Sequence, residues 1–210
     1  ADSTYKDVEL QFKIVTLGKI TPAIDSLKLH GEVNGTLNVL QKDNVYLPSS
    51  NLNIKNFGVN NITLGDLAIG IVGNRDLTDF VVNTTLVDKG AEKLSIVGNI
   101  SNREEIPQAN LIVDFNKFNL EPFSPLGEGI ITNIRGLLQG SAILKGPINN
   151  PNWSGVLSLN EAGIAIPYLN VDYSFAPYSR VKLSDQTFNF QKIKLTDVDM
   201  KTKATLDGTI

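Results

Sequence analysis

Apolar and polar residues alternate with a period of two along most of this chain. From Leu27 to Val39 every odd position is leucine, valine or glycine, and every even position is polar. Successive side chains of a strand point to opposite faces, so this pattern is typical of strands with one buried and one wet face. The pattern recurs over residues 8–14, 67–71, 80–86, 94–100, 111–115, 157–159, 169–175, 188–190 and 204–210.

Turn-forming residues separate these runs, about every 8–12 residues, which favours an all-β fold. The expected turns are Lys42-Asp43-Asn44, Pro48-Ser49-Ser50, Gly73-Asn74-Arg75-Asp76, Asp88-Lys89-Gly90 and Asn149-Asn150-Pro151. Three glycines between Leu126 and Leu138 disfavour a helix there. Short helical turns are expected only near Pro22-Ala23-Ile24-Asp25 and Pro125-Leu126.

The two halves of the chain match each other in sequence. Residues 29–35 and 52–59 lie over residues 134–140 and 157–164 at an offset of 105, and ordered Gly and Pro matches accompany the apolar ones. We predict two tandem β repeats, residues 1–105 and 106–210, each with about eight strands stacked on its neighbours. Because residues 206–210 stop inside a strand pattern, we expect this chain to be a piece of a longer protein.

Composition excludes several kinds of chemistry. The chain has no cysteine and a single histidine, His30, so disulfides, Cys-based zinc sites and multi-His metal sites are ruled out. His30 occupies a polar strand position and is expected to be solvated. Asp197 and Asp199 share a strand phase but lack the Gly and distal Glu of a calcium loop. The net charge of −3 argues against nucleic acid as a partner, and we expect neither a cofactor nor an enzyme.

Glycines four apart, Gly31 with Gly35 and Gly136 with Gly140, lie on one face of a strand. They lack the strand–loop–helix context of a phosphate site. We expect them to mark bends, or places where neighbouring backbones approach closely.

The order of motifs resembles the TamB family of translocation and assembly module subunits, within the wider AsmA-like group, and is similar to Bacteroidetes-type members. It runs through Phe118-x-Leu120-x-Pro122-Phe123-x-Pro125, Ile134-x-Gly136-x-Leu138-x-Gly140 and Ile166-Pro167-x-Leu169-x-Val171-x-Tyr173-x-Phe175. The resemblance implies a β-taco in a periplasmic protein that is anchored in the inner membrane by an absent segment. It also implies phospholipid transport between the membranes, or outer-membrane protein assembly with a TamA/BamA-type barrel, and no catalytic residues.

The alternation itself is compatible with a trough. We expect an elongated, curled antiparallel or mixed sheet whose apolar face forms a groove for phospholipid or other acyl chains. With 16–18 strands about 4.8 Å apart, the groove would be about 75–85 Å long. The residues expected to line it are Leu27, Leu29, Val33, Leu37, Val39, Leu52, Ile54, Leu67, Ile69, Ile71, Leu94, Ile96, Leu111, Val113, Phe115, Ile134, Leu138, Leu144, Leu157, Leu159, Leu169, Val171, Tyr173, Phe175, Phe188, Phe190 and Leu206.

Two other interpretations stay open at this point. In the first, the open sheet edges pair with strands of unfolded outer-membrane proteins. In the second, the chain forms a closed pair of β-sandwiches that acts as an adhesin or carbohydrate-binding module, with Trp153, Tyr168 and Tyr178 on a binding face.

Overall fold

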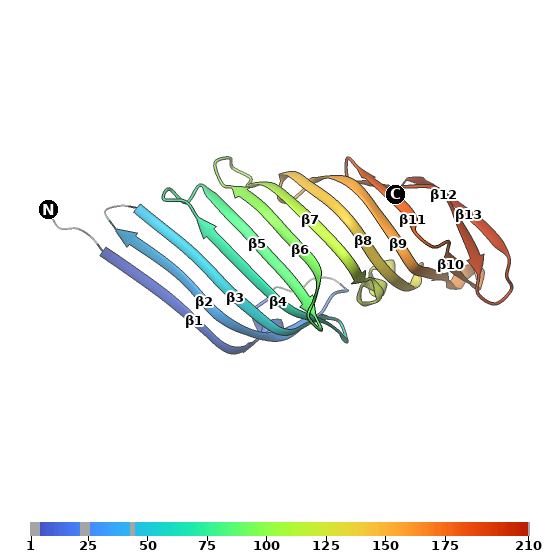
Figure 1. Cartoon of the computed structure of the whole chain (residues 1–210), viewed down its shortest axis with the longest axis horizontal. Coiled ribbons are helices and arrows are strands. Elements are labelled where there is room, and N and C mark those ends of the chain that lie inside the picture. Colours follow the sequence, from blue (N-terminus) through green and yellow to red (C-terminus); the bar gives the residue numbers. More distant parts are fainter. Residues whose placement is uncertain (1–4, 22–25, 43–44, 210) are drawn as a thin grey trace.

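The computed structural model describes residues 5–21, 26–42 and 45–209, which form one long sheet (Figure 1). The strands are β1 (Tyr5–Thr16), β2 (Leu29–Lys42), β3 (Val45–Val59), β4 (Ile62–Gly73), β5 (Asp79–Asp88), β6 (Ala91–Ser101), β7 (Gln108–Asn119), β8 (Thr132–Pro147), β9 (Asn152–Ile166), β10 (Val171–Phe175), β11 (Ser179–Ser184), β12 (Thr187–Asp197) and β13 (Lys203–Thr209). Three 3-10 helices interrupt them: η1 (Leu17–Lys19), η2 (Glu121–Gly127) and η3 (Pro167–Leu169).

Every pairing between these strands is antiparallel, and from β1 to β9 each strand pairs with the next along the chain. Past β9, two short strands share one place: β10 pairs with the end of β9 and β11 with its beginning. β12 then spans both short strands, and β13 pairs with β12. The all-β prediction is confirmed, whereas the pair of closed sandwiches is wrong, because the described strands form a single sheet.

The strands are longer and fewer than predicted. Residues 5–101 form six strands and residues 108–209 form seven, instead of about eight in each half. The main error concerns Pro48-Ser49-Ser50, which lies inside β3 and is not a turn. At Pro48, β3 is paired only with β2, so the missing proline N–H breaks no bond to β4. Because β10 and β11 both pair with β9 on the same side, the thirteen strands occupy twelve places across the sheet. Eleven spacings of about 4.8 Å between them give a sheet about 53 Å long, measured across the strands.

The other expected turns fall between strands, except that those at Lys42-Asp43-Asn44 and Pro22-Ala23-Ile24-Asp25 lie partly or wholly outside the described residues. The turn at Pro125-Leu126 is part of η2, which ends at Gly127, and β8 begins at Thr132. No long helix forms between Leu126 and Leu138, in agreement with the three glycines there.

The same order of elements occurs in both halves of the chain. Each half begins with a long strand, a 3-10 helix and two further long strands: β1, η1, β2, β3 and then β7, η2, β8, β9. Next comes β4 in the first half and the pair β10 and β11 in the second, and each half closes on a hairpin. The expected boundary at residue 105 lies in the β6–β7 connection. A tandem duplication stays a prediction.

A line of β-bulges crosses the sheet and bends its strands. Four register shifts fall on four-residue segments with apolar ends and a left-handed third residue. The segments are Phe12-Lys13-Ile14-Val15, Ile54-Lys55-Asn56-Phe57, Phe115-Asn116-Lys117-Phe118 and Phe190-Gln191-Lys192-Ile193. A bulge inserts one residue and bends its strand, so the apolar side chains before and after it face the same side. We call this line the crease.

Side chains of neighbouring strands accept hydrogen bonds from the bulged backbone. The N–H of Ile14 donates to Asn34 Oδ1 at 2.9 Å, and that of Asn56 donates to Asp66 Oδ1 at 3.0 Å. A bulge leaves a backbone donor without its ladder partner, and an unpaired donor is costly where water is excluded. These two side chains therefore stabilise the crease.

The whole molecule is extended rather than compact. Its accessible surface is 13132 Å², whereas a compact globular protein of this mass exposes about 9,600 Å². Figure 1 shows why: the strands lie side by side along one axis and curve at one end. None of the helices in the described parts of the chain is long and apolar enough to cross a membrane.

A candidate apolar trough

Register across the sheet aligns the inward side chains into three rows, which run at right angles to the strands. The deep row lies beside the crease and consists of Val15, Val33, Ile54, Leu67, Leu86, Leu94, Phe115, Gly140, Leu157, Val181, Phe190 and Gly208. The middle row consists of Phe12, Gly35, Leu52, Ile69, Thr84, Ile96, Val113, Ala142, Gly155, Leu183 and Phe188. The rim row consists of Leu10, Leu37, Ser50, Ile71, Val82, Gly98, Leu111, Leu144 and Trp153.

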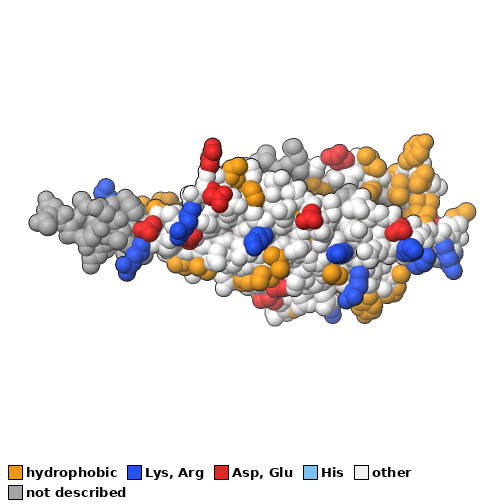
Figure 2. Space-filling view, turned by 90° about the horizontal axis from the view of Figure 1, so that it is seen from above, with side chains coloured by type: hydrophobic (Ala, Val, Ile, Leu, Met, Phe, Trp, Pro, Cys, Tyr) orange, Lys and Arg blue, Asp and Glu red, His pale blue; other side chains and the backbone are white. Residues whose placement is uncertain are grey.

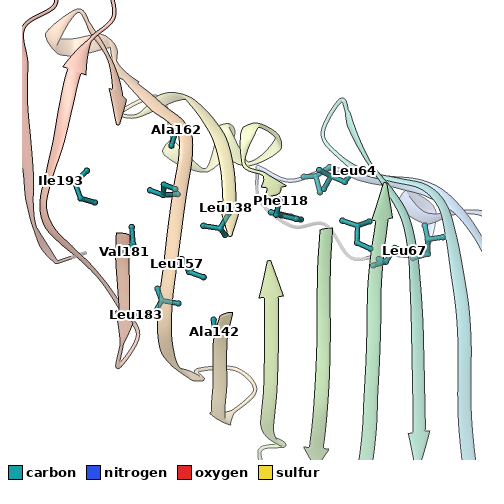
Figure 3. Close-up of a cluster of buried hydrophobic side chains, with 14 of the residues drawn as sticks. Leu64, Leu67, Phe118, Leu138, Ala142, Leu157, Ala162, Val181, Leu183 and Ile193 are labelled. Atoms are coloured by element: carbon teal, nitrogen blue, oxygen red, sulfur yellow. The ribbon is translucent and has the colours of Figure 1, made fainter. Parts of the chain in front are cut away.

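Over the whole sheet the deep row has more buried members than the middle row or the rim row. Val33 and Leu86 expose 1% and 0% of their surface, whereas Leu10, at the β1 end of the rim row, exposes 53%. No second sheet covers this face in the described parts of the chain, so the burial comes from the curvature of the strands and from the 3-10 segments. Figure 3 shows labelled side chains such as Leu138, Leu157 and Val181 turned into the space that the strands enclose.

Most residues predicted to line the groove lie in these rows, among them Val33, Ile54, Leu67 and Leu157, which are buried. A second group lies beyond the crease, buried in the core or packed against it: Leu29, Leu138, Leu159, Tyr173, Phe175 and Leu206. Leu27 also packs against the core, whereas Val39, Ile134 and Val171 are half-buried. The inward orientation that the alternation predicts is therefore present. The second group, however, lies beyond the crease, in or against the core, and not in the three rows.

Two predicted residues are placed differently. Leu169 belongs to η3, not to a strand, and exposes 58% of its surface, because Pro167 starts a helical turn and β10 begins only at Val171. Phe188 faces inward at the end of the middle row, beside the β11–β12 turn, and exposes 46%.

Several buried residues escaped the sequence prediction. Leu86, Val181 and Leu183 are in the rows, and Phe118, Ile193 and Leu195 lie just beyond the crease. Strict alternation does not find Phe118 or Ile193, because each follows the preceding inward aromatic residue by three positions. That three-residue step between apolar positions, repeated in four strands, is the sequence signal of the crease.

The η2 segment packs against the sheet near its centre. The Phe118 ring lies 5.6 Å from that of Phe115 and 5.8 Å from that of Phe123, measured between centroids. Asn60, in the β3–β4 turn, donates through Nδ2 to the carbonyl oxygen of Pro122 at 2.6 Å. The second half of the chain is therefore hydrogen-bonded to the first through η2 as well as through the β6–β7 ladder.

Two polar side chains lie flat across glycines at matching places in the halves. A Cβ on Gly58 would stand 2.2 Å from His30 Cε1, and one on Gly163 would stand 2.3 Å from Arg135 Cζ. The expectation that His30 is solvated holds for only part of the ring: the residue is half-buried, and its Nδ1 is buried with no hydrogen-bond partner among the described residues. Its Nε2 lies 3.5 Å from Thr63 Oγ1 on an exposed part of the surface. Gly58 leaves room for the ring against the backbone.

The predicted close approach at strand glycines is confirmed. Gly35 has a φ of +137°, and a Cβ there would stand 2.1 Å from the carbonyl oxygen of Asn51. Gly136, also at positive φ, would place a Cβ 2.4 Å from the Cα of Ala162. Only glycine fits such positions without strain.

No charged side chain belongs to any of the three rows, and the three ion pairs of the described residues lie outside them. Arg135 pairs with Asp172 at 2.6 Å, and the other pairs are Lys55–Asp66 and Arg103–Asp79. Hydrogen bonds from Arg103 lower the pKa of Asp79 to about 2, and those from Lys55 and the Asn56 N–H lower the pKa of Asp66. Figure 2 shows charges of both signs interspersed over one long face.

Metal-ligating side chains do not gather: within the described ranges no three His, Asp or Glu residues are placed to hold an ion. Asp197 is buried and serves the β12–β13 turn, where its Oδ1 accepts hydrogen bonds from the N–H groups of Asp199 and Met200. Trp153 and Tyr168 lie near opposite ends of β9, about 45 Å apart along an extended strand. Trp153 and Tyr168 are therefore too far apart to contact one small ligand together.

Comparisons with known proteins add nothing to this description: no family model matches the chain, and neither the curated proteins nor the solved structures include a match. The resemblance to the TamB family thus depends on the sequence motifs alone.

Proposed function

We propose that this chain is a segment of a periplasmic conduit that carries the acyl chains of phospholipids along its trough. In this proposal its parent is a TamB-type protein, which is anchored in the inner membrane and works with a TamA/BamA-type barrel in the outer membrane. The observation that carries the proposal is the continuity of the deep row, which places one apolar or glycine residue on each place of the sheet.

The energetics suit a carrier. Transfer of each CH₂ group from water to an apolar surface gains about 0.8 kcal/mol, so a partly covered acyl chain gains several kcal/mol. A step of one strand, about 4.8 Å, replaces one set of aliphatic contacts by a similar set. The bound free energy then changes little from step to step, which favours movement along the rows over capture at one of them.

Photocrosslinking tests this proposal with a matched pair of positions on β7. Leu111 faces inward in the rim row and is half-buried, whereas its neighbour Ile112 faces outward and is 44% exposed. A photoreactive residue at Leu111 should crosslink to phospholipid in cells and in vesicle mixtures, and one at Ile112 should not. Equal crosslinking from both positions, or none from Leu111, would contradict lipid transport in the trough.

A second function is favoured by the free edge of the sheet. Among the described residues, the twelve-residue strand β1 has a strand partner on one side only, β2, and its inward side chains Val8 and Leu10 are 55% and 53% exposed. An unpaired edge offers backbone donors and acceptors to an extended polypeptide. We propose strand addition by client outer-membrane proteins here, and crosslinks from Leu10 to protein rather than lipid would distinguish it.

A further inference from the structure

A hollow of about 310 Å³ lies beside the closed end of the β5–β6 hairpin. The hairpin turns at Asp88–Ala91, whereas its neighbours continue: residues 62–65 of β4 have no β5 partner, and residues 116–119 of β7 have no β6 partner. The two longer strands therefore flank a notch in the sheet.

The inner part of the hollow is apolar and joins the trough. Leu64, Leu86 and Phe118 line it, and they expose 7%, 0% and 8% of their surface. Leu86 is a member of the deep row, between Leu67 and Leu94. A chain that enters the notch reaches the lining of the trough directly.

Its outer part carries a positive balance of charge. Lys93, Lys117 and Asp88 line the hollow, and none of them is in an ion pair with another described residue. Two ammonium groups against one carboxylate leave one net positive charge over an apolar floor. This combination matches an aliphatic chain that ends in an anionic group.

The β12–β13 hairpin of the second half has a related hollow, which lies beyond the crease and is flanked by no strand beyond β13 in the described residues. There Leu195 is paired with Ala204 as Leu86 is paired with Leu94, and Lys203 precedes Ala204 as Lys93 precedes Leu94. Lys194, Leu195, Lys203 and Ala204 line a hollow of about 560 Å³. An apolar floor with lysine at its mouth therefore recurs at the matching hairpin.

We propose that the notch, and the related hollow at the β12–β13 hairpin, each bind the anionic end of a lipid, through its carboxylate or phosphate, while the acyl chain lies in the trough. This inference rests on the proposed function and deepens it. Lys93 and Lys117 hold the anion in the first half, and Lys203 is the corresponding lysine in the second. The two stations are six places apart in the sheet, about 29 Å.

Direct binding to the purified chain tests the proposal, with oleate, oleyl alcohol, phosphatidylglycerol and inorganic phosphate as separate probes. Oleate should bind about tenfold more tightly than oleyl alcohol, the size of one charge-assisted hydrogen bond. The double variant Lys93→Glu, Lys117→Glu should remove that difference and leave the affinity for oleyl alcohol unchanged. Asp88→Asn should strengthen oleate binding, because it removes the one carboxylate in the hollow.

The double variant Lys145→Glu, Lys182→Glu is the matched control, because it changes the net charge by the same amount and both lysines are exposed and outside the hollow. An equal loss of oleate binding in this variant would overturn the proposal, since long-range charge would then explain the effect. Binding of inorganic phosphate at the same affinity as phosphatidylglycerol would also overturn it, whereas tighter binding of oleate or of phosphatidylglycerol identifies the headgroup. Equal affinity for oleate and oleyl alcohol would refute the notch but not the trough, and binding of neither would refute the proposed function itself.

Discussion

Gly98 and Gly208 have nearly the same backbone conformation, so a comparison of the two separates backbone strain from crowding between strands. Their φ angles are +150° and +149°, so an alanine at either position is strained to the same degree. A Cβ on Gly98 would stand 2.1 Å from the carbonyl oxygen of Asn110 on β7, whereas one on Gly208 would meet nothing within 4 Å. β13 has no strand beyond it in the described residues.

The expected costs follow from these distances. Strain at an unfavourable φ costs about 1–3 kcal/mol, and the smaller entropy of an unfolded alanine offsets about 0.4–1 kcal/mol of it. Gly208→Ala should therefore cost about 1 kcal/mol. At Gly98 the Asn110 carbonyl must also move by more than 1 Å, and such overpacking adds about 1–3 kcal/mol. We expect Gly98→Ala to cost about 3 kcal/mol in total.

Urea unfolding followed by circular dichroism, together with thermal melts, measures both variants. For a chain of this size 1 kcal/mol shifts the Tm by about 2–4 °C, so Gly98→Ala should lower it by about 6–12 °C and Gly208→Ala by about 2–4 °C. Equal shifts would refute the reasoning, because the larger cost expected at Gly98 depends on the close approach of the Asn110 carbonyl on β7. In a longer chain that adds a strand beside β13, Gly208→Ala should become as costly as Gly98→Ala.

Three further predictions concern packing, pH and the crease. Leu157→Ala should destabilise the protein by about 3 kcal/mol and Val156→Ala by less than about 1 kcal/mol. The reason is that Leu157 is buried, whereas Val156 is 47% exposed on the other face. Equal unfolding midpoints of the two variants in urea would contradict the assigned faces. The folded pKa of Asp79, about 2, is below its usual value of 3.8. The contribution of Asp79 to the free energy of unfolding is therefore complete above pH 4 and is lost as the pH falls toward 2. Asp79→Asn should therefore lose less stability than wild type between pH 5 and pH 2.5. Asp66→Ala should cost about 1 kcal/mol by removing the acceptor of the Asn56 N–H, and faster hydrogen exchange at that amide would report the loss.

Alternation was sufficient to predict the strands and which of their faces is apolar. It identified Val33, Ile54 and Leu67 as inward residues because each run keeps a period of two as far as the first bulge. Beyond a bulge the phase shifts by one, so Phe118 and Ile193 face inward although simple counting places them outside. The number of strands was overestimated because a proline at one end of a long strand has the same local signature as a turn.

The notch could not be predicted from the sequence. It depends on where the β5–β6 hairpin stops relative to β4 and β7, and that is a matter of register between strands far apart in the chain. Lys93 and Lys117 are 24 positions apart, and nothing in their local sequence places them at one hollow. Their proximity follows only from the ladder that aligns Leu94 with Phe115.

Nearly every strand pairs with its neighbour in the chain, so the length of the sheet can change while its cross-section stays the same. Insertion of one hairpin adds about 10 Å and leaves the direction and inward face of every later strand unchanged, whereas insertion of a single strand would reverse all that follow. Evolution can therefore adjust the span of such a protein in hairpin-sized increments through duplication inside one gene, with no redesign of the core. Under the proposed function, the number of hairpins would then set how much of the distance between the two membranes the sheet covers.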